Sequence, residues 1–372
     1  MTDIENQNPS EFQKGIDERE SLVIREARFF EPYKEELKEL FTALNREDQW
    51  TDNPVDMLPY IQAGWIGSEH GNSTQKDQFT EDETAAAMVI LEKMGFTGEL
   101  LPDPDAAFDQ TVVVAGTTTA NYRRFQLTQS ARQHGTDLGT EVWLVGQRPR
   151  EARDGTNDAL LGTEGLYAGN DISDNPWANH ARKMIEESAE GGAESWKFTE
   201  TDTARIALLK VIGGDLKPDR IDLNLIRATD AENPLGAKIP VEGAPARDMT
   251  AYHFKTDDDH EIVLLNAGAV ERRNGDKIID PRHTTASATK EWLEKLPPKQ
   301  GARVLYVTGN PHSLRTTQDT YAMLQQMGRG DIELVVAGTT PAAGSPIQTY
   351  LGEIGRLINN DYKRNYQHEA AA

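Results

Sequence analysis

Short apolar runs alternate with segments of helical spacing along most of the chain. The apolar runs are residues 112–115, 142–145, 304–307 and 334–337. The helical segments are residues 21–44, 81–94, 121–134, 285–296, 313–327 and 348–359. Each apolar run ends at a glycine or threonine, which is typical of a strand buried in a parallel sheet. The pattern predicts an α/β fold: a Rossmann-like, mostly parallel sheet with helices on both faces, preceded by a helical N-terminal segment.

The same pattern divides the chain into three parts. Residues 1–20 are rich in acidic and amide side chains, and we expect a disordered tail there. Residues 21–105 contain two amphipathic segments and a Pro- and Gly-rich stretch at 47–80 that is typical of a loop, so we expect a helical cap. Residues 106–365 form the predicted Rossmann-like domain. Within it, residues 252–255 and 261–265 flank a run of aspartates and are typical of a strand pair.

Charge and composition exclude several classes of function. The net charge is −22, which repels a phosphate backbone, so we expect no nucleic-acid partner. The chain has no cysteine, so disulfides, thiolate metal sites and cysteine nucleophiles are excluded. We find no signal peptide and no apolar run of membrane-spanning length, and we expect a cytoplasmic protein without a membrane partner. No motif indicates a metal site, and no redox fingerprint is present.

The loop after residues 112–115 is the first candidate binding site. Ligands of open α/β sheets bind beyond the carboxyl ends of the strands. Here the loop contains Gly116, Thr117 and Thr118, which allow a sharp turn and offer hydroxyl groups to an anion. Arg123 and Arg124 follow early in a helix, where cations oppose the helix dipole unless an anion or an acidic side chain accompanies them. The alternative interpretation is that the threonines cap the helix and the arginines form salt bridges.

The loop after residues 304–307 is the second candidate. Asn310 is a good N-cap and Pro311 suits the first helical position. His312 and Arg315 would share a helix face, where they can bind an anionic group or move a proton. Because the cap would suffice to start the helix, alanine at either position should cost no more than ~0.5 kcal/mol of stability. The alternative is a plain cap with solvated side chains.

Three further residues complete the candidate set. Arg148 lies just past the end of the 142–145 run, where an exposed loop arginine is the alternative interpretation. Glu200 and Asp202 begin a helical segment, where capping competes with a role as general base or hydroxyl anchor.

These motifs, in this order, resemble the DUF218 type of bacterial family, related to the SanA, ElyC and YdcF proteins. The matching parts are residues 112–116 with Arg123 and Arg124, 199–202, 284–292, and 304–308 with His312 and Arg315. Gly-x-Arg-Pro at 146–149 and Thr-Glu-x-Asp at 199–202 look closer still to actinobacterial proteins of that kind. The resemblance implies a Rossmann-like fold over residues 110–340, with S-adenosylmethionine or a nucleotide as possible cofactor.

Together these observations predict a protein that binds a nucleotide-like or other anionic small molecule. Gly116, Thr117, Thr118 and Asn310 would hold the anion, Arg123, Arg124, Arg148 and Arg315 would neutralise it, and His312, Glu200 or Asp202 would act as acid or base. If the protein is an enzyme, hydrolysis or group transfer fits these residues best. The alternative is a non-catalytic module that binds a partner through its helical cap and acidic surface. The residues leave open the substrate, catalysis itself and the oligomeric state.

Overall fold

The computed structural model describes most of the chain and divides it into two compact units. The described residues are 23–66 except 27, 79–146, 226–227, 251–341 with gaps at 256–259, 268–269, 275–276 and 283–284, 345–366, and isolated positions between 204 and 211. The helical unit comprises residues 1–100, 309–322 and 340–372, and the sheet unit comprises residues 101–308 and 323–339. The grouping does not follow chain order. The domain boundaries expected from the sequence remain a prediction.

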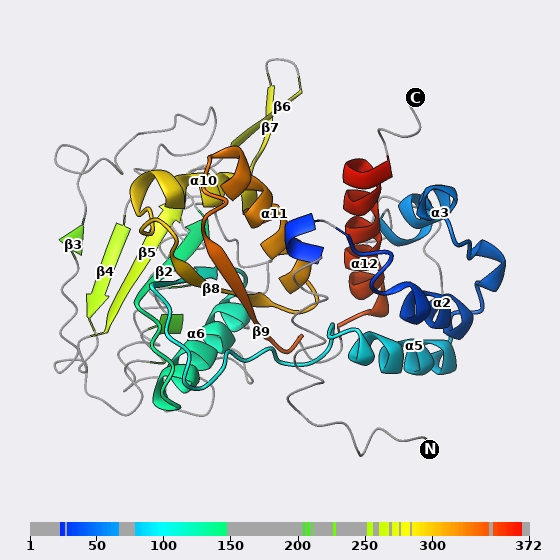
Figure 1. The fold of residues 1–372 in the computed structure, drawn as a ribbon, viewed down its shortest axis with the longest axis horizontal. Helices are drawn as coiled ribbons and strands as arrows, with labels where there is room; N and C mark the ends of the chain where they lie inside the picture. Colours follow the sequence, from blue (N-terminus) through cyan, green and yellow to red (C-terminus); the bar gives the residue numbers. More distant parts are fainter. Residues whose placement is uncertain are drawn as a thin grey trace, which may run out of the picture. The chain divides into compact units, whose positions relative to one another are not determined.

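A seven-stranded sheet forms the centre of the sheet unit, with the order β3-β4-β5-β2-β1-β8-β9. The strands are β1 (Gln110–Val114), β2 (Thr140–Gly146), β3 (Ile226–Arg227), β4 (Ala251–Lys255), β5 (Glu261–Ala267), β8 (Arg303–Gly309) and β9 (Glu333–Thr339). Five neighbouring strands of this sheet run parallel, in the order β5-β2-β1-β8-β9. Strand β4 pairs antiparallel with β5 (Figure 1). A separate hairpin pairs β6 (Val270–Asn274) with β7 (Lys277–Arg282). The predicted parallel sheet is therefore confirmed, as is the 252–255/261–265 strand pair.

The apolar strand runs fill the two faces of this sheet in alternation. Val113 and Trp143 share a cluster with Phe125 of helix α6 (Thr118–Gln133), and the Phe125 and Trp143 rings stack at 3.5 Å. Strand neighbours such as Val142 point to the opposite face, because successive side chains alternate along a strand. There, helix α10 (Thr285–Lys295) packs against β2 and β5. Burial on both faces explains why these runs are uniformly apolar.

The strand order reverses direction between β1 and β8. From β1 the chain proceeds outward through β2 to β5, whereas β8 lies on the other side of β1 and leads to β9. Val112 pairs with Val142 on one side and with Tyr306 on the other, both in parallel. The carboxyl ends of β1 and β8 thus lie side by side at one edge of the sheet. This is the Rossmann-like arrangement, and the reversal marks the place where such sheets bind ligands.

The helical unit is built around helix α12 (Ile347–Asp361). Its other elements are α2 (Lys34–Ala43), η2 (Glu47–Gln49), α3 (Pro54–Tyr60), η3 (Ile61–Ile66), α5 (Glu81–Lys93), the first part of α11 (Ser313–Gln326) and η7 (Tyr362–Tyr366). Helix α12 packs against α3, η3 and α5 and contributes Tyr350, Ile354 and Leu357 to an apolar core. No helix in the described part of the chain has the length and apolarity needed to cross a bilayer.

Two local expectations for the N-terminal segment were wrong. The helix expected over 21–44 is interrupted, and α2 begins only at Lys34. Pro32 cannot donate a helical hydrogen bond and disfavours helical geometry in the residue before it. The N–H groups of Phe29 and Phe30 instead donate to the Asp361 carboxylate, at 2.8 and 2.7 Å. The stretch expected to be a loop contains η2, α3 and η3, because Asn53 caps α3 and Pro54 starts it.

The turn into β2 requires a glycine, and its replacement should be costly. Gly139 has a φ of +55°, and a Cβ there would lie 2.4 Å from the Asp109 carbonyl oxygen. We expect Gly139→Ala to lower the free energy of unfolding by about 3 kcal/mol or more. Gly301→Ala is the matched control in the same unit, with a φ of +66° and open space around its Cβ. It should cost about 1–2 kcal/mol. Urea unfolding of both variants tests this, and equal losses would contradict it.

Candidate functional site

The loop after β1 is held in place by its own side chains. The Gly116 N–H donates to Asn121 Oδ1 at 2.7 Å, and Asn121 Nδ2 donates back to the Gly116 carbonyl at 3.2 Å. Thr117 caps α6, because its hydroxyl accepts the Ala120 N–H at 3.4 Å. Thr118 opens the helix. The helix-capping alternative is therefore confirmed for Thr117. The first amides of α6 point along the helix axis at the carboxyl edge of the sheet.

Arg124 is a buried cation beside this loop. It is 7% exposed, and its Nη1 donates to the Val114 carbonyl oxygen at the end of β1. A Cβ at residue 116 would lie 2.9 Å from this nitrogen, so Gly116 provides the space that the guanidinium occupies. Arg124 Nε is enclosed without a hydrogen-bond partner, and no described carboxylate forms an ion pair with the side chain. Burial lowers the pKa of Arg124 to about 10, so the group stays charged at neutral pH.

The loop after β8 differs from the expected cap. Helix α11 begins at Ser313, and the Asn310–Pro311 peptide bond is cis. Asn310 does not cap the helix; its Nδ2 donates to the carbonyl oxygens of Gly95 and Gly98, at 3.1 and 2.7 Å. Asn310 therefore ties the loop to the segment after α5. The cap expected for Asn310 and Pro311 was wrong because those two carbonyl groups lie within reach of the Asn310 amide.

His312 and Arg315 meet at a buried glutamate on α12. The Glu353 side chain is 0% exposed. Its Oε2 accepts Arg315 Nε at 2.5 Å, its Oε1 accepts Arg356 Nη1 at 2.5 Å, and His312 Nδ1 lies 3.1 Å from Oε1. Arg315 also donates to Asp319 at 3.0 Å. Burial alone would raise the pKa of Glu353, but His312 and Arg315 lower it to about 2, so the carboxylate is ionised.

Two polar atoms at the start of α11 are enclosed without a well-directed hydrogen bond. One is His312 Nδ1, which is near Glu353 but not aligned with it, and the other is Ser313 Oγ. Buried polar atoms without partners are uncommon in folded proteins. The first turn of α11 thus has hydrogen-bonding capacity that the described residues leave unused. No sequence pattern distinguishes Ser313 as a candidate.

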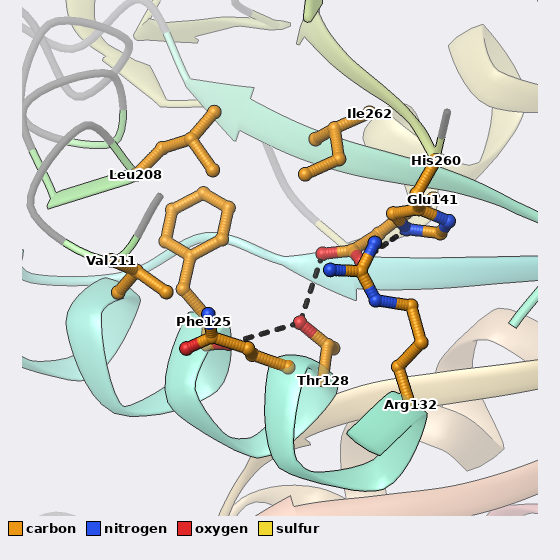
Figure 2. Close-up of a pocket in the computed structure, with 9 residues that line it drawn as sticks. Phe125, Thr128, Arg132, Glu141, Leu208, Val211, His260 and Ile262 are labelled. Atoms are coloured by element: carbon orange, nitrogen blue, oxygen red, sulfur yellow. Dashed lines mark hydrogen bonds and ion pairs between the residues drawn. The ribbon is translucent and has the colours of Figure 1, made fainter. Parts of the chain in front are cut away.

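A second polar cluster surrounds Glu141 in the sheet unit, beside a small hollow between α6 and the start of β2 and β5 (Figure 2). Glu141 accepts Trp143 Nε1 at 2.6 Å and Thr128 Oγ1 at 3.1 Å, and it lies 3.1 Å from His260 Nε2. Figure 2 shows the Arg132 guanidinium next to this pair. About 20 Å³ is open to the centre of a water molecule, which is room for about one water. The cluster lies at the amino ends of the strands, so we interpret it as structural.

The candidate residues fall into two groups and a remainder. Gly116, Thr117 and Arg124 come together at the β1 loop of the sheet unit, and Arg123 precedes Arg124 on α6. Asn310, His312 and Arg315 belong to the helical unit. Arg148, Glu200 and Asp202 lie outside the described residues, so their roles stay predictions.

The fold defines the class of protein: a Rossmann-like α/β protein with a parallel sheet. Comparisons with protein-family models, curated proteins and solved structures gave no match, so the family resemblance remains an expectation.

Glu353 is the main residue that the sequence interpretation missed. It follows Tyr350 by three residues and precedes Leu357 by four, so it lies on the apolar stripe of an amphipathic helix. A charged residue at such a position is rare unless it is paired. That periodicity was the available signal, although it could not identify the partners on α11.

The contacts of Glu353 change the stability that we expect for the alanine variants of His312 and Arg315. Arg315→Ala should lower the free energy of unfolding by about 1.5–3 kcal/mol, because a buried carboxylate loses a charged hydrogen bond. This replaces the earlier expectation of ~0.5 kcal/mol. His312→Ala should cost less than about 1 kcal/mol, because the ring is 37% exposed and poorly aligned with Glu353. Chemical denaturation of both variants provides the comparison, and equal costs would contradict this assignment.

Glu353 should also make stability depend on pH in the acid range. Its pKa is about 2 in the folded chain and 4.5 ordinarily, so the unfolded chain binds the proton more readily. The stabilisation is therefore complete above pH 4.5 and is lost as the pH falls toward 2, by about 3 kcal/mol in total. We expect the stability difference between wild type and Glu353→Gln to shrink over that window in urea titrations. A difference that stays constant from pH 7 to pH 3 would show that the glutamate is not held ionised.

Proposed function

We propose that this protein binds an anionic small molecule, nucleotide-like or otherwise phosphorylated or carboxylated, at the carboxyl edge of β1. The ligand would lie against Gly116, Thr117 and the first turn of α6, with Arg124 supplying the counter-charge and Arg123 adding to it. The proposal rests mainly on one observation: Arg124 is a buried cation with no carboxylate partner among the described residues.

Burying an unpaired charge is costly. An ion removed from water loses several kcal/mol of solvation unless a counter-charge or hydrogen bonds replace the water. Arg124 has one neutral acceptor, the Val114 carbonyl group, and an unused Nε–H. An arginine fork with donors to spare is well suited to a carboxylate or phosphate. A bound anion would account for a charge that otherwise only destabilises the fold.

The surroundings of Arg124 favour an anion for a separate reason. The first amides of α6 lack acceptors within the helix, and the N-terminal end of a helix carries partial positive charge. Loops at the point where a parallel sheet reverses its strand order are the usual ligand sites of this fold. A local positive site on a chain with a net charge of −22 would also select against large polyanions, because the rest of the surface repels them.

Hydrolysis or group transfer, with His312 of the helical unit moving the proton, is the second candidate function. The observation that favours it is the contact between His312 and a buried, ionised glutamate, since such a carboxylate commonly orients a histidine that moves protons. The family resemblance adds S-adenosylmethionine and nucleotides to the compounds worth testing. Glu200 and Asp202 remain the other proposed acid–base residues.

The alternative, a partner-binding module, has less support. Such a module would bind through its helical cap and acidic surface, and an apolar contact site on the cap would expose several large hydrophobic side chains. Within the described ranges, only Val89 and Leu101 are large hydrophobic residues with high exposure. Single exposed apolar residues are ordinary on protein surfaces.

Replacing Arg124 with methionine should separate ligand binding from stability. Without ligand, we expect Arg124→Met to be neutral or stabilising, because methionine fills the space without a buried charge. In thermal-shift measurements with phosphate, nucleotides, S-adenosylmethionine and sugar phosphates, the wild-type chain should be stabilised by at least one compound. The expected gain is about 2.7 kcal/mol at a hundred times the dissociation constant, and Arg124→Met should abolish it.

Arg132→Gln is the matched control, since Arg132 lies on the same helix but lines the hollow beside Glu141. It should keep the ligand response. Glu200→Gln and Asp202→Asn test whether an acidic side chain supplies the counter-charge instead. A wild-type chain that responds to no anion, together with an Arg124→Met variant that is strongly destabilised, would contradict the proposal.

A further inference from the structure

We propose that Glu353 is a positioning residue for His312: its carboxylate fixes the Nδ1 edge of the ring inward, so that Nε2 faces solvent as the proton-accepting atom. The inference rests on the proposed role of His312 in proton transfer. It concerns the helical unit alone and assigns a role to Glu353 of α12.

The His312 backbone is held on both sides. Its N–H donates to the Gly309 carbonyl at 2.9 Å, and its own carbonyl accepts the Thr316 N–H at 2.9 Å and the Thr316 hydroxyl at 2.7 Å. With the backbone fixed at the start of α11, only side-chain torsions remain to set the direction of the ring. The group that lies against the ring therefore decides which nitrogen is offered to solvent.

Burial distinguishes the two ring nitrogens. His312 Nδ1 is enclosed and lies 3.1 Å from Glu353 Oε1, yet 37% of the side chain is exposed. Because Nδ1 is enclosed, the exposed part of the ring is the opposite edge, which carries Nε2. A carboxylate next to Nδ1 favours the tautomer with the proton on that nitrogen and leaves a lone pair on Nε2.

Glu353 is suited to this task because it cannot move or lose its charge easily. Arg315 and Arg356 each donate to a different oxygen of the carboxylate, which leaves Oε1 facing His312. Arg315 also forms an ion pair with Asp319, at 3.0 Å, so a second carboxylate accompanies the two arginines. The carboxylates of Glu353 and Asp319 are thus held by Arg315 and Arg356, and Arg364 also acts on Asp319.

The proton balance of the step is simple. A water molecule or hydroxyl group that acts as the nucleophile would give its proton to Nε2, and the ring would become an imidazolium whose Nδ1 edge still lies against Glu353. The same proton would pass from Nε2 to the leaving group, which restores the neutral ring. Glu353 stays ionised throughout and exchanges no proton.

Asp361 shows what a purely structural carboxylate looks like on the same helix. It is also buried, but it accepts the N–H groups of Phe29 and Phe30 and the Asn365 amide. None of those donors is a histidine. Asp361→Asn is therefore a matched control: it perturbs a buried carboxylate of α12 without touching the His312 ring.

The test is the tautomer of His312 in the full chain, read from long-range proton–nitrogen NMR correlations with nitrogen-15-labelled histidine. The chain has eight histidines, and the spectrum of His312→Gln identifies the signal by its loss. At a pH where the ring is neutral, we expect wild-type His312 to carry its proton on Nδ1. The preference should fall by roughly tenfold in Glu353→Met, because the negative charge next to Nδ1 is removed.

Methionine is used at residue 353 because glutamine would still offer an acceptor oxygen. Asp361→Asn should leave the tautomer unchanged. A wild-type ring protonated on Nε2 overturns the inference, and so does a Glu353→Met spectrum identical to wild type. If Glu353→Met does not fold, the wild-type spectrum alone decides. No ligand enters the measurement, so a failure of the proposed anion binding would appear separately, in the thermal-shift series.

Discussion

The parallel pairing of β1 with β2 on one side and β8 on the other is the constraint on which the candidate site depends. It places the carboxyl ends of β1 and β8 next to each other. It also makes the chain leave these strands toward opposite ends of the sheet, and sheets of this kind bind ligands at such a reversal. The β1 loop, which contains Gly116 and leads into α6, begins at this edge. If β1 were elsewhere in the order, that loop would not lie at a ligand-binding edge.

Buried charges in this protein are treated in three ways, and the contrast supports the interpretation of each. Glu141 accepts hydrogen bonds from Thr128 and Trp143 and lies next to His260, and the Arg132 guanidinium is close to it (Figure 2). Glu353 is paired with two arginines and stays ionised. Arg124 alone among these three has no opposite charge in the described part of the chain. A buried charge that has partners of opposite charge indicates a structural or positioning role. A buried charge without such a partner indicates a ligand-binding role.

The sequence predicted the sheet well because the strands are buried on both faces. That burial makes runs such as 112–115 and 304–307 uniformly apolar, and the glycine or threonine after each run marks the strand end. Local patterns were less reliable where a distant residue decides the outcome. Asn310 was expected to cap α11 but donates to Gly95 and Gly98, which are more than two hundred residues away. Similarly, Arg315 was expected to bind an anion, whereas its partner in the structure is Glu353, on a helix whose position no local spacing reveals.

Direct observation of the Arg124 guanidinium is the sharpest test of the central claim. Its Nε–H has no partner in the described structure, so its proton–nitrogen NMR signal should report the arrival of an anion. The measurement is a titration of the full chain with phosphate and then with nucleotides, with Arg124→Met used to assign the signal. The account predicts that at least one anion shifts this resonance in a saturable way and slows its exchange with water. A resonance that stays unchanged at saturating concentrations of every anion would contradict it.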